Sequence, residues 1–205
     1  RILYPIWMLT GMFGIMYIPS KLLVANNLTL TAQNILANEL DFRAGIAASL
    51  LTQLIYICAA VLLYHFFKHI HKTQATLMLI FTLVGVPIAM LNELNYLAVL
   101  KTLNNPELLE LFLYLHKMGV VIAAIFWGLW LFPLGYLVYK SGYFPKVLGP
   151  IVIIGGIGYL AGSFIKILFP AAENIINGCE IMTFGEVIFL AWLVFLGAKI
   201  PKDNS

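Results

Sequence analysis

The chain has 205 residues and a formal net charge of +3, and 62% of its residues are hydrophobic while only 10% are charged. Soluble domains carry about 45–50% apolar and about 25% charged residues, so this composition excludes a water-soluble protein and predicts an integral membrane protein. The basic residues are few and scattered along the chain, which excludes nucleic acid as a partner.

Six apolar segments of suitable length divide the chain. About 20 helical residues cross the roughly 30 Å of hydrocarbon in a bilayer, because each residue advances a helix by about 1.5 Å. We therefore expect an all-α fold, a six-span transmembrane helical bundle that forms one integral membrane domain over residues 1–205. The expected spans cover approximately residues 3–24, 44–67, 74–100, 116–139, 147–169 and 181–196.

The second span has a long helical lead-in. Thr31 is a predicted N-cap, and apart from Gly45 no helix breaker follows it before Lys72. A helix that continues to Phe67 is about 54 Å long, which exceeds the thickness of the bilayer. We expect its first turns, AQNILANELDFR, to form an amphipathic lead-in on the extracytoplasmic side.

Prolines mark the helix boundaries and bends farther along the chain. Pro87 and Pro133 predict kinks inside the third and fourth spans. Asn105 followed by Pro106 predicts the start of the fourth helix, because asparagine caps helices and proline fits the first turn. The sequence SGYFP, residues 141–145, predicts a tight turn before the fifth span.

Loop charges predict the orientation in the membrane. An even number of spans places both termini on one side. Seven of the twelve basic residues fall in short connections on that side, and five fall on the other. By the positive-inside rule, we expect the N- and C-termini to lie in the cytoplasm.

Polar side chains inside the spans fall in the half of the membrane away from the termini. A charged group at the centre of a membrane helix costs about 2.5–3.5 kcal/mol on insertion scales, so each such group needs a partner. Their common depth predicts a polar pocket open toward the periplasm, lined by Arg43, Gln53, Asn92, Glu93, Asn95, His116, Ser163, Lys166 and Glu186.

Several of these residues have two interpretations. Glu93 is either the functional centre of the pocket or part of a hydrogen-bonded contact between helices, in which Asn92 and Asn95 share one face. Arg43 pairs either with Glu93 or with Glu39, which lies four residues earlier in the favourable orientation. Glu186 either belongs to the pocket or extends its carboxylate to the membrane surface.

Two tryptophans lie in the middle of the fourth span, away from the membrane interfaces where tryptophan is enriched. Trp127 and Trp130 can wall an apolar ligand pocket, or they can pack against core or lipid. We include both residues among the candidates for the pocket.

No metal or cofactor is expected. His65 and His69 are four residues apart, but no cysteine or acidic residue at their level completes a metal site. No pair of histidines lies at one depth on facing helices, as haem ligation requires. Cys58 falls in a span and Cys179 in a loop, so we expect two free thiols.

Four segments together resemble the family of bacterial multi-pass membrane proteins catalogued as DUF 4386: NILANELDFRAGI (34–46), VPIAMLNELNYLA (86–98), IFWGLWLFPLGYLVYKSGYFPKVLG (125–149) and GYLAGSF (158–164). The resemblance implies a protein of the bacterial inner (cytoplasmic) membrane. It implies no reaction and no ligand, and it supplies no catalytic residue.

Two classes of function remain open at this point. The first is a non-catalytic membrane module that binds lipid or docks as an accessory subunit, with membrane lipids and other membrane protein subunits as partners. Gly158 and Gly162 favour it, because a G-x-x-x-G spacing permits close helix packing. The alternative is a small membrane enzyme or transporter that handles a lipidic or small polar substrate in the polar pocket, with catalytic residues unknown.

Overall fold

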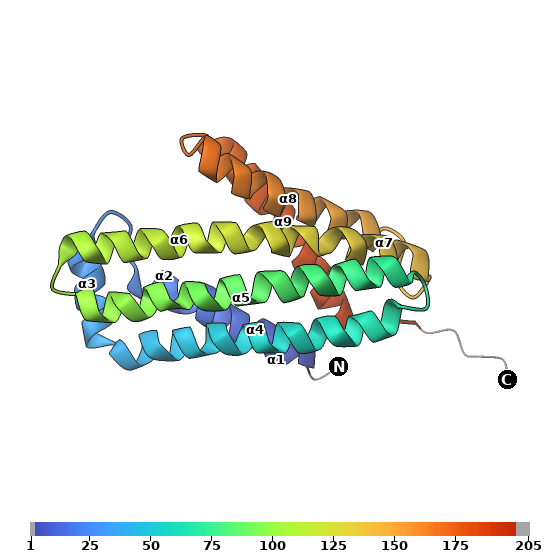
Figure 1. Ribbon diagram of the computed structural model, residues 1–205, viewed down its shortest axis with the longest axis horizontal. Coiled ribbons are helices and arrows are strands. Elements are labelled where there is room, and N and C mark those ends of the chain that lie inside the picture. The colour runs from blue at the N-terminus through green and yellow to red at the C-terminus, as the bar shows by residue number, and fades with distance from the viewer. Residues whose placement is uncertain (1–2, 200–205) are drawn as a thin grey trace.

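The computed structural model describes residues 3–199, and this part of the chain contains helices and no strand (Figure 1). The expected all-α bundle is confirmed. Its helices are α1 (Leu3–Gly11), η1 (Met12–Tyr17), α2 (Ile18–Leu22), α3 (Leu28–Ala37), α4 (Glu39–Phe67), α5 (Lys72–Thr102), α6 (Pro106–Leu129), α7 (Leu131–Ser141), α8 (Leu148–Leu168) and α9 (Glu173–Phe195).

The first helical segment is continuous but changes its geometry. The π-helix η1 joins α1 to α2, and the residues at both junctions keep right-handed helical dihedral angles. Within η1, Gly14 lies against α4 so closely that a Cβ there would be 2.7 Å from the carbonyl oxygen of Gly45. A glycine is therefore required at this crossing.

Five helical segments in the described part of the chain are long and apolar enough to cross a membrane: 39–67, 72–102, 106–141, 148–168 and 173–195. α1, η1 and α2 have 9, 6 and 5 residues, so none of them is long enough by itself. Residues 3–22 together have the length of a span. The sixth span therefore stays a prediction.

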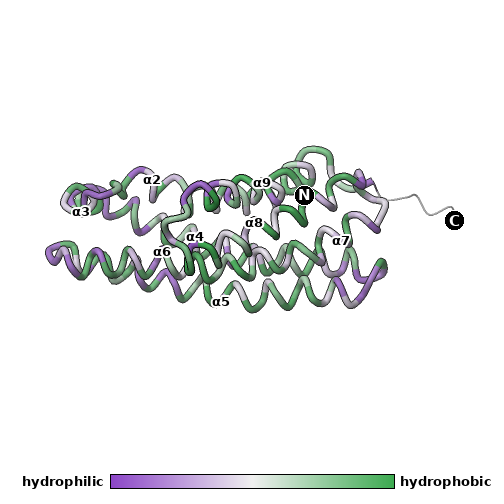
Figure 2. Tube along the Cα trace, turned by 90° about the horizontal axis from the view of Figure 1, so that it is seen from above, coloured by the Kyte–Doolittle hydropathy of each residue, from purple (hydrophilic) through white to green (hydrophobic). Residues whose placement is uncertain are grey.

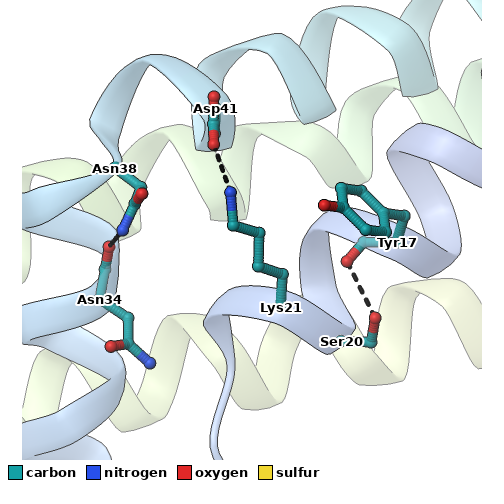
Figure 3. Close-up of polar contacts among 6 residues, drawn as sticks. All are labelled: Tyr17, Ser20, Lys21, Asn34, Asn38 and Asp41. Atoms are coloured by element: carbon teal, nitrogen blue, oxygen red, sulfur yellow. Dashed lines mark hydrogen bonds and ion pairs between the residues drawn. The ribbon is translucent and has the colours of Figure 1, made fainter.

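The predicted lead-in to α4 is wrong in its details. Asn27, and not Thr31, caps the helix, since its side chain accepts a hydrogen bond from the backbone N–H of Leu30 at 2.9 Å. The helix then breaks at Asn38, whose side chain donates to the carbonyl oxygen of Asn34 (Figure 3). Asparagine side chains compete in this way for backbone groups, which favours an interruption.

The break at Asn38 makes α3 a separate helix that runs across the ends of α4, α5 and α6 (Figure 1). Lys21 in α2 forms an ion pair of 2.7 Å with Asp41 in the first turn of α4 (Figure 3). This contact joins the first helical segment to the start of the second across the α3 connection.

The remaining boundary signals give mixed outcomes. Asn105 caps α6, as predicted, and Pro106 is its first residue. Gly142 adopts a φ of +70° after α7, which confirms the turn predicted over residues 141–145. Pro87 lies inside α5, which continues through it without interruption. Near Pro133 the helix divides at Trp130 into α6 and α7, and the kinks expected at both prolines stay predictions.

The interruption at Trp130 has a steric cause. A proline lacks the N–H that would bond to the carbonyl group four residues earlier, and its ring also clashes with that group. For Pro133 the affected carbonyl group belongs to Leu129, the last residue of α6. Trp130 is 0% exposed and packs in the main hydrophobic core with Trp7 and Tyr56.

Helices α8 and α9 form a tightly packed hairpin. A Cβ at Gly158 would lie 2.6 Å from the carbonyl oxygen of Cys179. The predicted loop around Cys179 is wrong, because α9 begins at Glu173 and Cys179 lies buried inside it. The helix begins well before Cys179, with Glu173 in its first turn, where an acidic residue stabilises a helix.

The outer faces of the long helices carry exposed hydrophobic side chains, among them Leu54, Leu62, Leu91, Ile122, Ile154 and Phe184. In Figure 2, the long helices are hydrophobic through their middle and hydrophilic toward their ends. This pattern matches the layers of a bilayer. The chain is therefore a multi-pass helical membrane protein.

The end of the described chain returns to the α7–α8 turn, where the backbone N–H of Lys199 donates to the carbonyl oxygen of Tyr143. α1 begins, and α9 ends, toward the side of the α4–α5 and α7–α8 turns (Figure 1). Among the residues counted for the charge bias, Arg1 and Lys202 lie outside the described residues. The cytoplasmic location of this side stays a prediction.

Candidate functional site

A cavity of about 560 Å³ lies between the first helical segment, α3, α4, α5 and α6, with one residue of α8 at its border. We refer to it as the cavity. Most of its wall is apolar and is formed by Ile15, Pro19, Leu23, Val24, Ala89, Leu113, Val120, Val121, Ala123 and Trp127. Of the two predicted tryptophans, Trp127 therefore lines the cavity and Trp130 does not.

Buried polar side chains from three helices gather on the cavity wall. They are Gln53 of α4, Asn92 and Glu93 of α5, and His116 of α6, and all four line the cavity. Their exposed fractions are 5%, 7%, 8% and 8%. The sequence placed these four residues at a common depth, and the structure brings them to one cavity.

Asn92 fixes the contact between α5 and α6. Its side-chain amide donates to the carbonyl oxygen of His116 at 2.9 Å, and its own oxygen accepts from the side-chain amide of Asn95 at 2.9 Å. Gly119 makes room for this arrangement, because a Cβ there would collide with the amide group of Asn92. For Asn92, the interpretation as a hydrogen-bonded contact between helices therefore holds, whereas Asn95 bonds within α5.

Glu93 faces His116 across the α5–α6 contact. The distance between Glu93 Oε1 and His116 Nε2 is 3.6 Å, longer than a hydrogen bond but within the range of an ion pair. The ring of Tyr96 stacks on His116 with 3.3 Å between the ring centroids and 7° between the planes. The stacking holds the imidazole in place beside the carboxylate.

Three buried atoms in this group have no hydrogen-bond partner within residues 3–199: Gln53 Oε1, Glu93 Oε2 and His116 Nε2. Most buried side-chain polar atoms in proteins do have a partner. Leaving one without a partner costs about 1–3 kcal/mol, and more where the group is charged. All three atoms belong to residues of the cavity lining.

The border of the cavity carries charges of both signs. Glu110 and Lys117 of α6 and Lys166 of α8 belong to its lining. Lys166 also forms an ion pair of 2.8 Å with Glu180 of α9. The border also includes the exposed residues Ile15, Ala25, Asn26 and Tyr114, so the cavity is open to its surroundings.

The structure does not bring the other predicted residues into the cavity. Arg43 pairs with Glu39 at 2.7 Å on the surface and not with Glu93, because the local partner lies one helical turn away. Ser163 is buried on α8, outside the cavity lining. The prediction that all these residues share one pocket is therefore wrong for Arg43, Asn95, Trp130, Ser163 and Glu186.

Glu186 belongs to a separate contact between α8 and α9. Its carboxylate accepts a hydrogen bond from the hydroxyl group of Tyr159 at 3.0 Å. The side chain therefore pairs inside the hairpin and does not extend to the membrane surface. Sequence reasoning missed Tyr159 here and Tyr96 in the cavity. Tyr96 follows Glu93 by three residues, a spacing that places both on one helix face.

No group of three or more histidine, cysteine or acidic side chains within residues 3–199 could hold a metal ion. His69 lies with its Nε2 atom 2.9 Å from the hydroxyl oxygen of Tyr143. This contact links the α4–α5 turn to the α7–α8 turn and gives His69 a structural role.

Comparison with known proteins gives two matches. A protein of Archaeoglobus fulgidus that is described only as an uncharacterized protein is 34% identical over 151 residues, which cover 73% of this chain and 81% of that protein. No solved structure matches the chain. The family described as "Domain of unknown function (DUF4386)" matches residues 2–197. The chain therefore belongs to the DUF4386 family, as the four sequence segments suggested.

Proposed function

We propose that this protein is a non-catalytic membrane module that binds one amphiphilic, lipid-like molecule in the cavity. The observation that carries the proposal is the set of buried polar atoms without partners on an otherwise apolar wall. An apolar body fits the wall, and a polar end group satisfies the unpaired atoms.

The size of the cavity supports this proposal. Ligand sites in proteins typically enclose about 300–1,000 Å³ and combine an apolar lining with a few polar groups. A cavity of about 560 Å³ falls inside that range and has the same composition. Docking as an accessory subunit stays a separate prediction, because it does not depend on the cavity.

A second candidate function is a small membrane enzyme or transporter that uses the same cavity. One observation favours it, namely the carboxylate of Glu93 at 3.6 Å from the imidazole of His116. Carboxylate and imidazole groups placed side by side serve in general acid–base chemistry.

Two tryptophan substitutions on α6 test the binding proposal. Val120→Trp fills the cavity, whereas Ile122→Trp places the same side chain at a 45% exposed position outside the lining. Native mass spectrometry of protein extracted in a mild detergent measures the bound mass. We expect the wild type and Ile122→Trp to retain a lipid-like adduct and Val120→Trp to lose it.

Two results contradict the proposal: a wild type without any adduct, and an adduct that Val120→Trp keeps at the wild-type level. A third result supports the second candidate. If the bound molecule changes chemically during incubation with the wild type and not with Glu93→Gln, the cavity is a reaction site.

A further inference from the structure

We infer that the polar end of the bound molecule is an ammonium group, which lies between Glu93 and Gln53. This inference rests on the proposed function and names the chemical class of its ligand. A long-chain amine or an amino-headed lipid is the kind of molecule that fits.

The unpaired atoms determine the hydrogen-bonding character of the ligand. Of the three unpaired atoms, His116 Nε2 already lies 3.6 Å from Glu93 Oε1. The other two are Gln53 Oε1, an amide oxygen, and Glu93 Oε2, a carboxylate oxygen, and neither has a partner in the described part of the chain. Both atoms accept hydrogen bonds and cannot donate them while Glu93 is ionised. A complementary ligand must therefore present donors, and an ammonium group has up to three.

The charge of Glu93 favours a cation over a neutral donor. Within residues 3–199, no lysine or arginine nitrogen lies within 4.0 Å of its carboxylate, and its ion-pair contact is to His116 at 3.6 Å. A carboxylate inside a membrane bundle is expensive unless a positive charge accompanies it. A bound ammonium group supplies that charge, and a hydroxyl group does not.

Aromatic side chains add to the attraction for a cation. Tyr96 and Trp127 both line the cavity, from α5 and α6. The face of an aromatic ring attracts an ammonium group within about 6 Å, and the attraction is stronger where water is excluded. Tyr96 stacks one face on His116, so Trp127 is the ring with the more accessible surface.

The basic border of the cavity favours the opposite ligand, an anion. Lys117 and Lys166 lie in the lining, but Lys166 is already paired with Glu180 at 2.8 Å. Lys117 is exposed, and water and salt weaken the interactions of exposed charges. Glu93 is 8% exposed, so water and salt screen its charge less than those of the two lysines. We therefore assign the inner end of the cavity to a cation.

A series of probe molecules with one tail and three head groups tests this inference. Decylamine, decanol and decanoate are titrated into the purified protein in a nonionic maltoside detergent, and the bound fraction is measured by native mass spectrometry. On the wild type, we expect decylamine to bind about tenfold or more tightly than decanol, from the strength of charged hydrogen bonds. Decanoate should bind most weakly.

Substitutions of two acidic residues test whether the preference for the amine depends on the charge of Glu93. Glu93→Gln keeps the shape and removes the charge, so decylamine and decanol should then bind within about twofold of each other. Glu93→Asp keeps the charge and should keep the preference for the amine. Glu110→Gln is the matched control, since Glu110 is the other acidic residue of the lining but lies exposed at its border.

The binding of the three probes tests the ammonium inference, and the Val120→Trp comparison tests the proposed function independently. Equal binding of the amine and the alcohol to the wild type overturns the inference, as does tightest binding of decanoate. So does an amine preference that Glu93→Gln retains. In each of these cases the Val120→Trp comparison still decides whether the cavity binds an amphiphile. Circular dichroism and size-exclusion profiles equal to those of the wild type establish that Glu93→Gln is folded.

Discussion

The hydroxyl group of Tyr159 donates a hydrogen bond of 3.0 Å to the carboxylate of Glu186, from α8 to α9. Removal of the hydroxyl group leaves a carboxylate oxygen without this donor in an apolar environment. We expect Tyr159→Phe to lower the free energy of unfolding by about 1–3 kcal/mol. Thermal unfolding in detergent measures the loss.

Tyr139→Phe provides the matched control for this change. Tyr139 is 44% exposed on α7, so water or lipid headgroups can take the place of its hydroxyl group's interactions. Its loss should change the unfolding temperature little. Equal unfolding temperatures for Tyr159→Phe and the wild type would show that the bond contributes nothing to the hairpin.

Two glycines of the α8–α9 hairpin should respond to substitution in opposite ways. A Cβ at Gly158 would meet the backbone of Cys179 at 2.6 Å, so Gly158→Ala must separate the helices. We expect it to destabilise the protein by about 1–3 kcal/mol, as overpacking does. Gly178 has nothing within 4 Å, and Gly178→Ala should stabilise α9 by about 0.5–1 kcal/mol. Thermal unfolding of both variants, side by side, checks the difference in sign.

Asn92→Ala and Glu93→Gln, two substitutions in α5, should have different effects on the thermal unfolding of the protein. Asn92→Ala removes the bond to the carbonyl oxygen of His116 and leaves Asn95 without an acceptor, so it should cost about 1 kcal/mol, the scale of hydrogen bonds between membrane helices. Glu93→Gln removes no hydrogen bond and replaces a buried carboxylate by a neutral group of nearly the same shape, so it should not lower stability. A loss of stability for Glu93→Gln would identify this residue as structural.

Cysteine labelling tests the predicted orientation. In a background with Cys58→Ala and Cys179→Ala, single cysteines replace two exposed residues at opposite ends of the bundle, Lys146 before α8 and Asn104 before α6. With the termini in the cytoplasm, a membrane-impermeant maleimide added to intact cells should label Asn104→Cys and spare Lys146→Cys. The reverse pattern would show that the termini lie outside the cytoplasm.

The bacterial inner membrane also stays a prediction, since the relative described above comes from an archaeon.

Local chemistry explains why some elements could be predicted from the sequence. Asn105 and Pro106 start α6 through contacts within one turn, and Gly142 ends α7 through its own backbone conformation. Such signals need no knowledge of neighbouring helices. The close approach at Gly158 likewise follows from a short sequence motif.

Other features depend on contacts that the sequence does not display. Asn27 and Thr31 are both good caps, and the choice of Asn27 leaves the Thr31 hydroxyl group to bond with Val24. For the cavity, the position of a residue along its span predicts its depth in the membrane, and this depth grouped Gln53 and His116 correctly. The sequence does not show toward which neighbouring helix a side chain points, so Glu186 was grouped with residues that it does not contact.

The exposed border of the cavity determines how a ligand reaches it. Ile15 is 41% exposed and suits the acyl region of a bilayer, whereas Tyr114 is 56% exposed and suits its interface with water. Glu110 and Lys117 form a charged part of the same border, so a molecule dissolved among the lipids has an apolar approach only on the side of Ile15. Its concentration in the surrounding membrane, and not in the aqueous phase, would then set how often the protein is loaded.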